Sequence, residues 1–132
     1  MAVQRRNTHQ RQLVLDAVIA RSDHPTAEEI YHDVRAHDEK ISRGTVYRNL
    51  NLLEEAGAIR SVHVPGGNRF DRRIEDHAHV TCLICGSVQD APLAYDDAVD
   101  ARAAAETGYD VESHSTVFYG ICPACQRKQQ TT

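Results

Sequence analysis

The sequence predicts an α+β fold built as two domains. Apolar residues recur at helical spacing through the first 57 residues, and β-forming residues and turns follow them. The charges divide as well, because residues 1–73 hold 12 of the 15 Lys and Arg against 10 acids, whereas residues 74–132 hold 3 against 9. We therefore expect one domain over residues 1–73 and a second over residues 74–132.

Two helices are predicted to open the first domain. The first covers residues 11–20, where apolar side chains recur at helical spacing: Leu13, Val14, Ala17 and Val18. The second follows a break at residues 24–25 and ends near His37. Its N-cap is Thr26, and Glu29 reaches back to the Thr26 backbone, which is the pattern of a capping box.

A third helix and a hairpin complete the domain. The helix begins after Ser42, stops at Gly57 and carries an apolar stripe of Val46, Leu50 and Leu53. The β-formers of residues 59–64, a Pro-Gly-Gly-Asn turn at 65–68 and residues 69–71 predict a β-hairpin. Three helices followed by a hairpin are typical of a winged helix-turn-helix, a DNA-binding unit whose third helix enters the major groove.

Side chains suited to DNA lie on that helix and hairpin. Arginines there can contact phosphates or base edges, and Tyr47 can contact a thymine methyl group. The DNA-contact candidates are Arg43, Thr45, Tyr47, Arg48, Asn49 and Arg69. The alternative is an ordinary amphipathic helix whose arginines form only a solvated face.

The second domain is predicted to begin after a linker at residues 72–76, where the charge changes sign. We expect β-runs at 79–83 and 87–90, a helix at 96–107 ended by Gly108, and a strand at 111–119. Residues 126–132 are expected to fray. With no Trp and two Phe in the whole chain, so small a domain would gain stability from a bound metal.

The four cysteines of the chain form two CxxC pairs: Cys82 with Cys85, and Cys122 with Cys125. Two such pairs offer four thiolates at the spacing of a structural Zn²⁺ site. Four thiolates leave no open coordination position, so we expect a scaffold and not a reactive centre. Redox-active dithiols or separate buried cysteines are the alternatives.

A second group of possible metal ligands precedes and follows the first CxxC pair. Residues His77 and His79 on an extended segment would place both imidazoles on one face of a strand. With Asp71 and Asp90, and with His24 as a fifth candidate ligand, they form a mixed nitrogen and oxygen set suited to Fe²⁺, Mn²⁺ or Zn²⁺. Surface histidines without a metal are the alternative.

Several other classes of protein are disfavoured. No apolar stretch is long enough to span a membrane, and residues 1–6 lead into polar sequence without the apolar region of a signal peptide. We therefore expect a cytoplasmic protein, whose reduced thiols favour zinc over disulfides. A metal-dependent hydrolase is a distant alternative, but no spare general base accompanies the His/Asp group, so we expect no enzyme.

Eight short segments match one known family in order along nearly the whole chain. They are Thr8-His9-Gln10-Arg11, His24-Pro25-Thr26-Ala27, Thr45-Val46-Tyr47-Arg48-Asn49-Leu50, Glu55-Ala56-Gly57, Arg69-Phe70-Asp71, His77-Ala78-His79, Cys82-Leu83-Ile84-Cys85-Gly86 and Tyr119-Gly120-Ile121-Cys122. In these segments the chain resembles the ferric uptake regulator (Fur) family of bacterial metal-dependent repressors. The resemblance implies a winged-helix domain, an α/β dimerisation domain, and a homodimer that binds palindromic double-stranded operator DNA.

The resemblance also assigns ligands. It implies that the four cysteines hold structural Zn²⁺, and that a regulatory Fe²⁺ or Mn²⁺ is held by His24, Asp71, His77, His79 and Asp90. Iron sensors of the family usually carry Glu at the positions of Asp71 and Asp90, whereas this chain resembles the peroxide-sensing PerR branch in carrying Asp at both. That branch implies iron-catalysed oxidation of His24 or His77, loss of the metal and derepression. Iron- or zinc-responsive repression is the alternative within the family.

The chain departs from the family pattern in two places. His9 stands where a proline is common, and Asp76 and Ala78 stand where iron sensors often have His and Asp. The second departure leaves a third metal site with only Asp97 and His114 as candidate ligands. A complete third site is therefore not expected.

Overall fold

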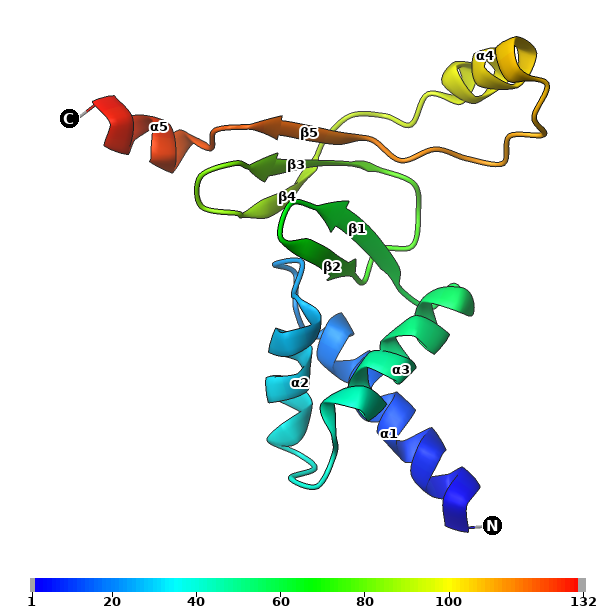
Figure 1. The fold of residues 1–132 in the computed structure, drawn as a ribbon, viewed down its shortest axis with the longest axis vertical. Helices are drawn as coiled ribbons and strands as arrows, with labels where there is room; N and C mark the ends of the chain where they lie inside the picture. The colour runs from blue at the N-terminus through cyan, green and yellow to red at the C-terminus, as the bar shows by residue number, and fades with distance from the viewer. Residues whose placement is uncertain (1, 131–132) are drawn as a thin grey trace. The chain divides into compact units, whose positions relative to one another are not determined.

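The structure, a computed structural model, describes residues 2–130 (Figure 1). Its contacts divide the chain into a first unit, Met1–Ile74, and a second unit, Glu75–Thr132. Helices come first and a mixed set of strands and helices follows, so the predicted α+β fold is confirmed. None of the helices within residues 2–130 is both long and apolar enough to cross a membrane.

Three helices form the body of the first unit (Figure 1): α1 (Ala2–Ile19), α2 (Ala27–Arg35) and α3 (Arg43–Glu55). They contact one another through one apolar core. Val14 and Val18 of the first predicted stripe and all three residues of the stripe on the third helix are buried there, while Leu13 and Ala17 are partly buried against it. The buried side chains of the core are Val14, Val18, Ile30, Tyr31, Val34, Ile41, Val46, Leu50, Leu53, Ile59 and Phe70. Burial of these apolar faces is what holds the three helices together.

Helices α2 and α3 begin at their predicted N-caps, Thr26 and Ser42. Thr26 Oγ1 accepts a hydrogen bond from Glu29 N at 3.1 Å, and Glu29 Oε1 accepts one from Thr26 N at 3.1 Å, which completes the capping box. Ser42 Oγ likewise accepts from Thr45 N at 3.1 Å. These bonds satisfy amide groups that a helix start leaves without an intrahelical partner.

The prediction for the first helix was too short. We expected it over residues 11–20, but α1 begins at Ala2. An apolar stripe reports only the part of a helix that packs on a core. The preceding residues are mostly polar, although many are good helix formers, so they extend the helix without an apolar stripe.

A two-stranded antiparallel hairpin, called the wing below, completes the first unit. Strands β1 (Arg60–Val64) and β2 (Gly67–Asp71) pair in register, with Arg60 opposite Asp71. The turn places Gly66 and Gly67 at φ 94° and 128°, conformations that glycine adopts without strain. On its other side, β2 forms an isolated antiparallel bridge between Arg69 and Thr26, and this bridge joins the wing to the start of α2.

The second unit contains a three-stranded sheet in the order β4-β3-β5. Strand β3 (Ala78–Cys82) pairs antiparallel with β4 (Val88–Ala91) and parallel with β5 (Val117–Gly120). In sequence, α4 (Asp97–Thr107) lies between β4 and β5, and Asp96 is its N-cap. The helix ends at Gly108, at φ 77°, as predicted. None of the residues of α4 is buried.

Two predictions for this unit were wrong. The strand expected over residues 111–119 covers only Val117–Gly120, because β3 supplies just four paired positions, from His79 opposite Val117 to Cys82 opposite Gly120. The tail expected to fray from residue 126 instead forms α5 (Pro123–Gln130), while residues 131–132 lie outside the described residues. Proline at the first position of α5 is a start signal for a helix.

Candidate functional site

The four cysteines form one cluster in the second unit, as their spacing predicted. All four Sγ atoms lie within 4.8 Å of one another, and no disulfide joins any of them. Cys85 Sγ and Cys122 Sγ are 3.8 Å apart. Thiolates at about 2.3 Å from a tetrahedral Zn²⁺ would be about 3.8 Å apart, so the cluster has the size that zinc requires.

Backbone amides surround the sulfurs. Cys82 Sγ accepts from the amides of Ile84, Cys85 and Cys122, each at 3.4 Å. Cys122 Sγ accepts from Cys125 N at 3.5 Å. Each CxxC pair thus brings its own amide groups to a sulfur, and hydrogen bonds of this kind favour the charged thiolate.

The cluster cannot carry four negative charges without a cation. The amide hydrogen bonds, from Cys122 first, lower the pKa of Cys82 to about 6. The neighbouring Cys122 thiol, together with burial, raises the pKa of Cys125 to about 12. A thiol beside a thiolate keeps its proton because a second negative charge would be repelled. A divalent cation removes that repulsion and so fits the group.

Two of the predicted regulatory ligands meet in the first unit. His24 Nε2 lies 3.3 Å from Asp71 Oδ2, and both side chains are buried. The other carboxylate oxygen, Asp71 Oδ1, accepts from Arg73 N at 2.9 Å. The imidazole and the carboxylate therefore present a nitrogen and an oxygen side by side, a donor pair that suits Fe²⁺, Mn²⁺ or Zn²⁺.

The backbone at His24 is unusual. Among residues 2–130, His24 is the one non-glycine residue in the left-handed region, with φ at 55°. Its carbonyl oxygen accepts from Arg69 Nη1 at 3.1 Å, and the next carbonyl, of Pro25, accepts from Phe70 N at 2.8 Å. The loop that carries His24 and Pro25, called the histidine loop below, is thus held against β2, the strand that ends at Asp71.

The other three predicted ligands meet in the second unit. His79 on β3 stands directly opposite Asp90 on β4, with His79 Nε2 3.4 Å from Asp90 Oδ1. His77 Nε2 lies 3.1 Å from the same oxygen, and the two imidazole centroids are 4.4 Å apart. Antiparallel pairing places His79 opposite Asp90, and His77, just before β3, brings a second imidazole nitrogen to the same carboxylate.

The tautomer of His77 is set by the backbone. His77 Nδ1 lies 2.7 Å from the carbonyl oxygen of Glu75. Since a carbonyl only accepts, Nδ1 carries the proton and the lone pair of the neutral ring is on Nε2, the nitrogen that faces Asp90. A hydrogen bond of this kind from the second ring nitrogen is usual for histidines that bind metals.

A third metal site is not assembled from the two expected residues. His114 Nδ1 lies 2.6 Å from Asp100 Oδ1, one helical turn beyond Asp97. Asp100 also accepts from the hydroxyl of Tyr95, whose ring stacks on His114 with centroids 4.5 Å apart. These two donors hold the pKa of Asp100 below its usual range. The structure thus places His114 in a hydrogen-bonded cluster with Tyr95 and Asp100.

The predicted DNA contacts on α3 fall into two groups. Arg43, Tyr47 and Arg48 are exposed, and Thr45 is half-buried near the start of the helix. Asn49 is buried, and its amide nitrogen donates to the Thr45 carbonyl at 2.8 Å. The exposed side chains are available to a partner, whereas Asn49 bonds to the backbone of its own helix.

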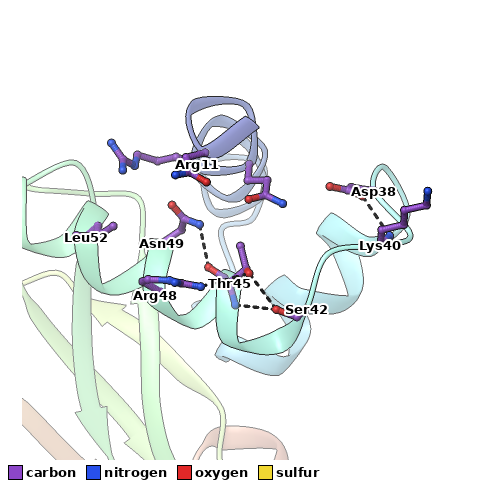
Figure 2. A pocket seen from close by; sticks show the side chains of 10 residues that line it. Arg11, Asp38, Lys40, Ser42, Thr45, Arg48, Asn49 and Leu52 are labelled. Atoms are coloured by element: carbon purple, nitrogen blue, oxygen red, sulfur yellow. Dashed lines mark hydrogen bonds between the residues drawn. The ribbon is translucent and has the colours of Figure 1, made fainter. Parts of the chain in front are cut away.

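A groove of about 550 Å³ runs between α1, the loop before α3 and α3 itself (Figure 2). Figure 2 shows three cationic side chains around it, Arg11, Lys40 and Arg48, with one acidic side chain, Asp38. Ser42 and Thr45 add hydroxyl groups at the start of α3. Cations, hydroxyls and a helix start are the groups that contact phosphates along a DNA backbone.

Sequence reasoning missed two charged residues next to these sites. Glu28 on α2 lies 2.8 Å from Arg43, and Arg21 lies within 3.1 Å of three carboxylates, those of Asp23, Glu29 and Asp33. Partners that lie 8 to 15 residues apart on different elements leave no periodic signal. Only Asp23, two residues from Arg21, was a neighbour that the sequence could indicate.

Known proteins resemble this chain closely. The profile of the ferric uptake regulator family matches residues 2–119. The peroxide-responsive repressor PerR of Staphylococcus saprophyticus is 36% identical over 124 residues, which cover 93% of this chain and 84% of that protein. The peroxide operon regulator of Bacillus subtilis is 34% identical over 125 residues, covering 94% and 86% respectively.

Solved structures show the same fold. The peroxide stress regulator of Campylobacter jejuni matches with a TM-score of 0.76 and 31% identity. The match covers 94% of each chain. The residues that the family profile matches include Cys82, Cys85 and the five His and Asp residues, whereas Cys122 and Cys125 follow the matched range.

Proposed function

This chain belongs to the ferric uptake regulator family, and we propose that it is a peroxide-responsive, metal-dependent repressor. Members of this family are DNA-binding regulators of transcription and not enzymes, so the hydrolase alternative is set aside.

The pairing of histidines with aspartates is the observation that carries the proposal. Asp71 lies beside His24, and Asp90 lies beside His77 and His79. The resemblance to peroxide sensors rests on aspartate at both positions, and both curated relatives named above are peroxide regulators. An aspartate is one methylene shorter than a glutamate, so it can leave a coordination position open.

The five side chains would act as ligands of a single Fe²⁺ or Mn²⁺. His24 and Asp71 come from the first unit, and His77, His79 and Asp90 from the second. Ligands shared in this way would couple the two units, because the ion binds fully only when both ligand sets converge. The affinity of the protein for metal then contributes to its affinity for DNA through linkage.

Bound Fe²⁺ would supply the electron that reduces hydrogen peroxide at the site. His24 and His77 are the proposed targets of the resulting oxidation. An oxidised imidazole binds metal poorly, so the ligand set would lose a member and the two units would separate. Repression would then end. Mn²⁺ does not reduce peroxide readily, so the same ligands would hold it without damage.

The four cysteines are proposed to hold a structural Zn²⁺. Their sulfur spacing fits this ion, and a filled Cys₄ site has no open position for chemistry. Cys82 of the first pair is the last residue of β3. The zinc would therefore fix the strand that carries His79.

The DNA-binding surface is proposed to lie on α3 and the groove beside it. Arg43, Tyr47 and Arg48 are exposed on α3, while Arg11 and Lys40 add positive charge next to it. In the winged helix-turn-helix, this helix enters the major groove. The operator would be palindromic double-stranded DNA, and the protein would act in the cytoplasm.

The protein is proposed to bind that operator as a homodimer through its second unit. Strand β5 is at the edge of the sheet, and two aromatic side chains of β5 are exposed, Phe118 and Tyr119. An exposed apolar edge strand is suited to pairing with a second copy. Two winged helices in a dimer would match two half-sites.

An iron- or zinc-responsive repressor is the runner-up, since the same ligand types serve those sensors. The distinguishing experiment compares operator binding by zinc-loaded protein with added Fe²⁺, Mn²⁺ or Zn²⁺, before and after micromolar peroxide. The proposal requires that each metal that occupies the site promotes binding and that peroxide abolishes it only with Fe²⁺. Binding that survives peroxide in the iron form would favour the runner-up.

A further inference from the structure

We propose that Arg69 positions the ligand His24 and does not contact DNA, so that the wing strand β2 controls the first-unit half of the regulatory site. This inference rests on the proposed function, because it takes His24 to be a metal ligand. It reassigns a residue that the sequence placed among the DNA contacts.

The contacts of Arg69 point toward the histidine loop. Its Nη1 donates to the His24 carbonyl at 3.1 Å, and its backbone forms the bridge to Thr26. The side chain is half-buried, unlike the exposed Arg43 and Arg48 of α3. A guanidinium held on a carbonyl oxygen in this way serves the loop and is less available to a phosphate.

The hydrogen bond matters because of the backbone conformation that it holds. A histidine at φ 55° is less stable than one in the extended region, so the surroundings must maintain it. The carbonyl of His24 turns with that backbone, and Arg69 bonds that carbonyl. Without the donor, the backbone of His24 can relax and Nε2 would move away from Asp71 Oδ2, which now lies 3.3 Å from it.

The rest of the loop is anchored independently. Arg21 bonds both oxygens of Asp23, at 2.8 and 3.0 Å, and also bonds Glu29 at 2.8 Å. The other carboxylate oxygen of Glu29, Oε1, accepts a hydrogen bond from Thr26 N. Residues on both sides of His24 are therefore held to the body of the unit. Loss of the Arg69 bond should alter the His24 peptide without unfolding α2.

The two roles of Arg69 make different predictions for the variant Arg69→Met, which keeps the length of the stem and removes every donor. The full-length zinc-loaded protein is titrated with Mn²⁺ alone and the unbound Mn²⁺ is measured by electron paramagnetic resonance. Operator binding is then measured at saturating Mn²⁺ over a range of salt concentrations. The matched control is Arg48→Met, on the proposed DNA surface.

A positioning role predicts that Arg69→Met weakens Mn²⁺ binding without DNA by about tenfold or more, the usual effect of losing a residue that orients a ligand. Operator affinity at saturating Mn²⁺ and its salt dependence should equal those of the wild type. Arg48→Met should show the reverse, with unchanged Mn²⁺ affinity and a salt slope reduced by about one. Arg69→Lys, which keeps one donor, should recover part of the Mn²⁺ affinity.

The proposal is overturned if Arg69→Met binds Mn²⁺ like the wild type, or if it reproduces the pattern of Arg48→Met. If the Met variant fails to fold, as judged by circular dichroism, the same comparison is made with Arg69→Lys, for which wild-type Mn²⁺ affinity together with weaker operator binding overturns the proposal. A wild-type protein that binds its operator equally well without added metal would instead contradict the proposed function.

Discussion

The carboxylate of Glu28 on α2 binds the guanidinium of Arg43 at the start of α3, with Oε1 2.8 Å from Nη2. The hydroxyl of Tyr47 donates to the same carboxylate at 3.4 Å. Arg43 holds the pKa of Glu28 below its usual range, so the carboxylate stays charged at neutral pH. Two of the proposed DNA contacts thus share one acidic partner when DNA is absent.

The first prediction concerns that shared acid. Glu28→Gln removes a negative charge from the proposed DNA surface and releases Arg43 from an ion pair. We expect operator affinity at saturating Mn²⁺ to rise by about threefold to tenfold at low salt, and the gain to shrink as salt increases. Fluorescence anisotropy at several salt concentrations measures this. Unchanged affinity at low salt would mean that Arg43 does not face DNA.

The second prediction concerns Tyr47, whose side chain is 41% exposed on α3. We expect Tyr47→Ala to lose about 1–3 kcal/mol of base discrimination per half-site, enough to abolish specific binding by a dimer. Zinc content should stay at the wild-type level, because the cysteine cluster belongs to the second unit. Competition between operator and scrambled DNA is the measurement. Retained preference for the operator would place sequence readout on other residues.

The third prediction concerns acid and the cysteine cluster. The amide hydrogen bonds that lower the pKa of Cys82 to about 6 stabilise its thiolate in the folded state. The folded pKa is depressed, so this contribution is complete above the ordinary thiol pKa and is lost as pH falls through about 6. Bound zinc acts in the same direction because its ligands must be deprotonated.

Because the bound ion lowers the pKa of its thiolate ligands further, we expect acid to release zinc below pH 6, and we expect the second unit to unfold as zinc leaves. A chromophoric zinc chelator and circular dichroism report the two events during one acid titration. Cys122→Ser is the control, and it should lack tightly bound zinc already at neutral pH. A second unit that stays folded after zinc has left would contradict the structural role of the metal.

The fourth prediction concerns the length of the carboxylate ligands. Asp71→Glu and Asp90→Glu keep the charge but move the oxygens outward by one methylene, toward the arrangement that resembles iron sensors. The double variant should keep Mn²⁺-dependent operator binding within about tenfold of the wild type. A much higher peroxide concentration should be needed to dissociate the iron form of this variant from its operator. Equal peroxide sensitivity would show that aspartate is not what tunes the response.

The local part of this structure could be predicted from sequence, and the non-local part could not. The capping box of Thr26 and Glu29 follows from a spacing of three residues and is confirmed. The four-cysteine cluster is the exception among non-local contacts, because the metal chemistry of two CxxC pairs predicted that they would meet although Cys85 and Cys122 are 37 residues apart. Helix α5 lacks an apolar stripe, so periodicity did not report it. The strand expected from residue 111 was limited by the length of β3, a property of its partner.

The geometry around His24 is the clearest example of what the sequence does not contain. The carbonyl of this left-handed residue accepts a hydrogen bond from Arg69, which lies 45 residues away along the chain. The ion pairs of Arg21 and Glu28 likewise join separate elements that meet only after folding. Residue types indicated which side chains could bind metal or DNA, whereas these contacts determine the position and orientation of those side chains.

The most direct test of the central claim is to locate peroxide damage within the protein. Zinc-loaded protein carrying Fe²⁺ or Mn²⁺ receives micromolar peroxide, and tryptic peptides 22–35 and 74–102 are analysed by mass spectrometry beside operator binding. Peptide 22–35 contains both His24 and the exposed His32, so fragmentation provides an internal control. We predict that one oxygen atom is added at His24 or His77, not at His32, and that DNA binding is lost with Fe²⁺ alone. An iron form that stays unmodified and remains on its operator would contradict peroxide sensing.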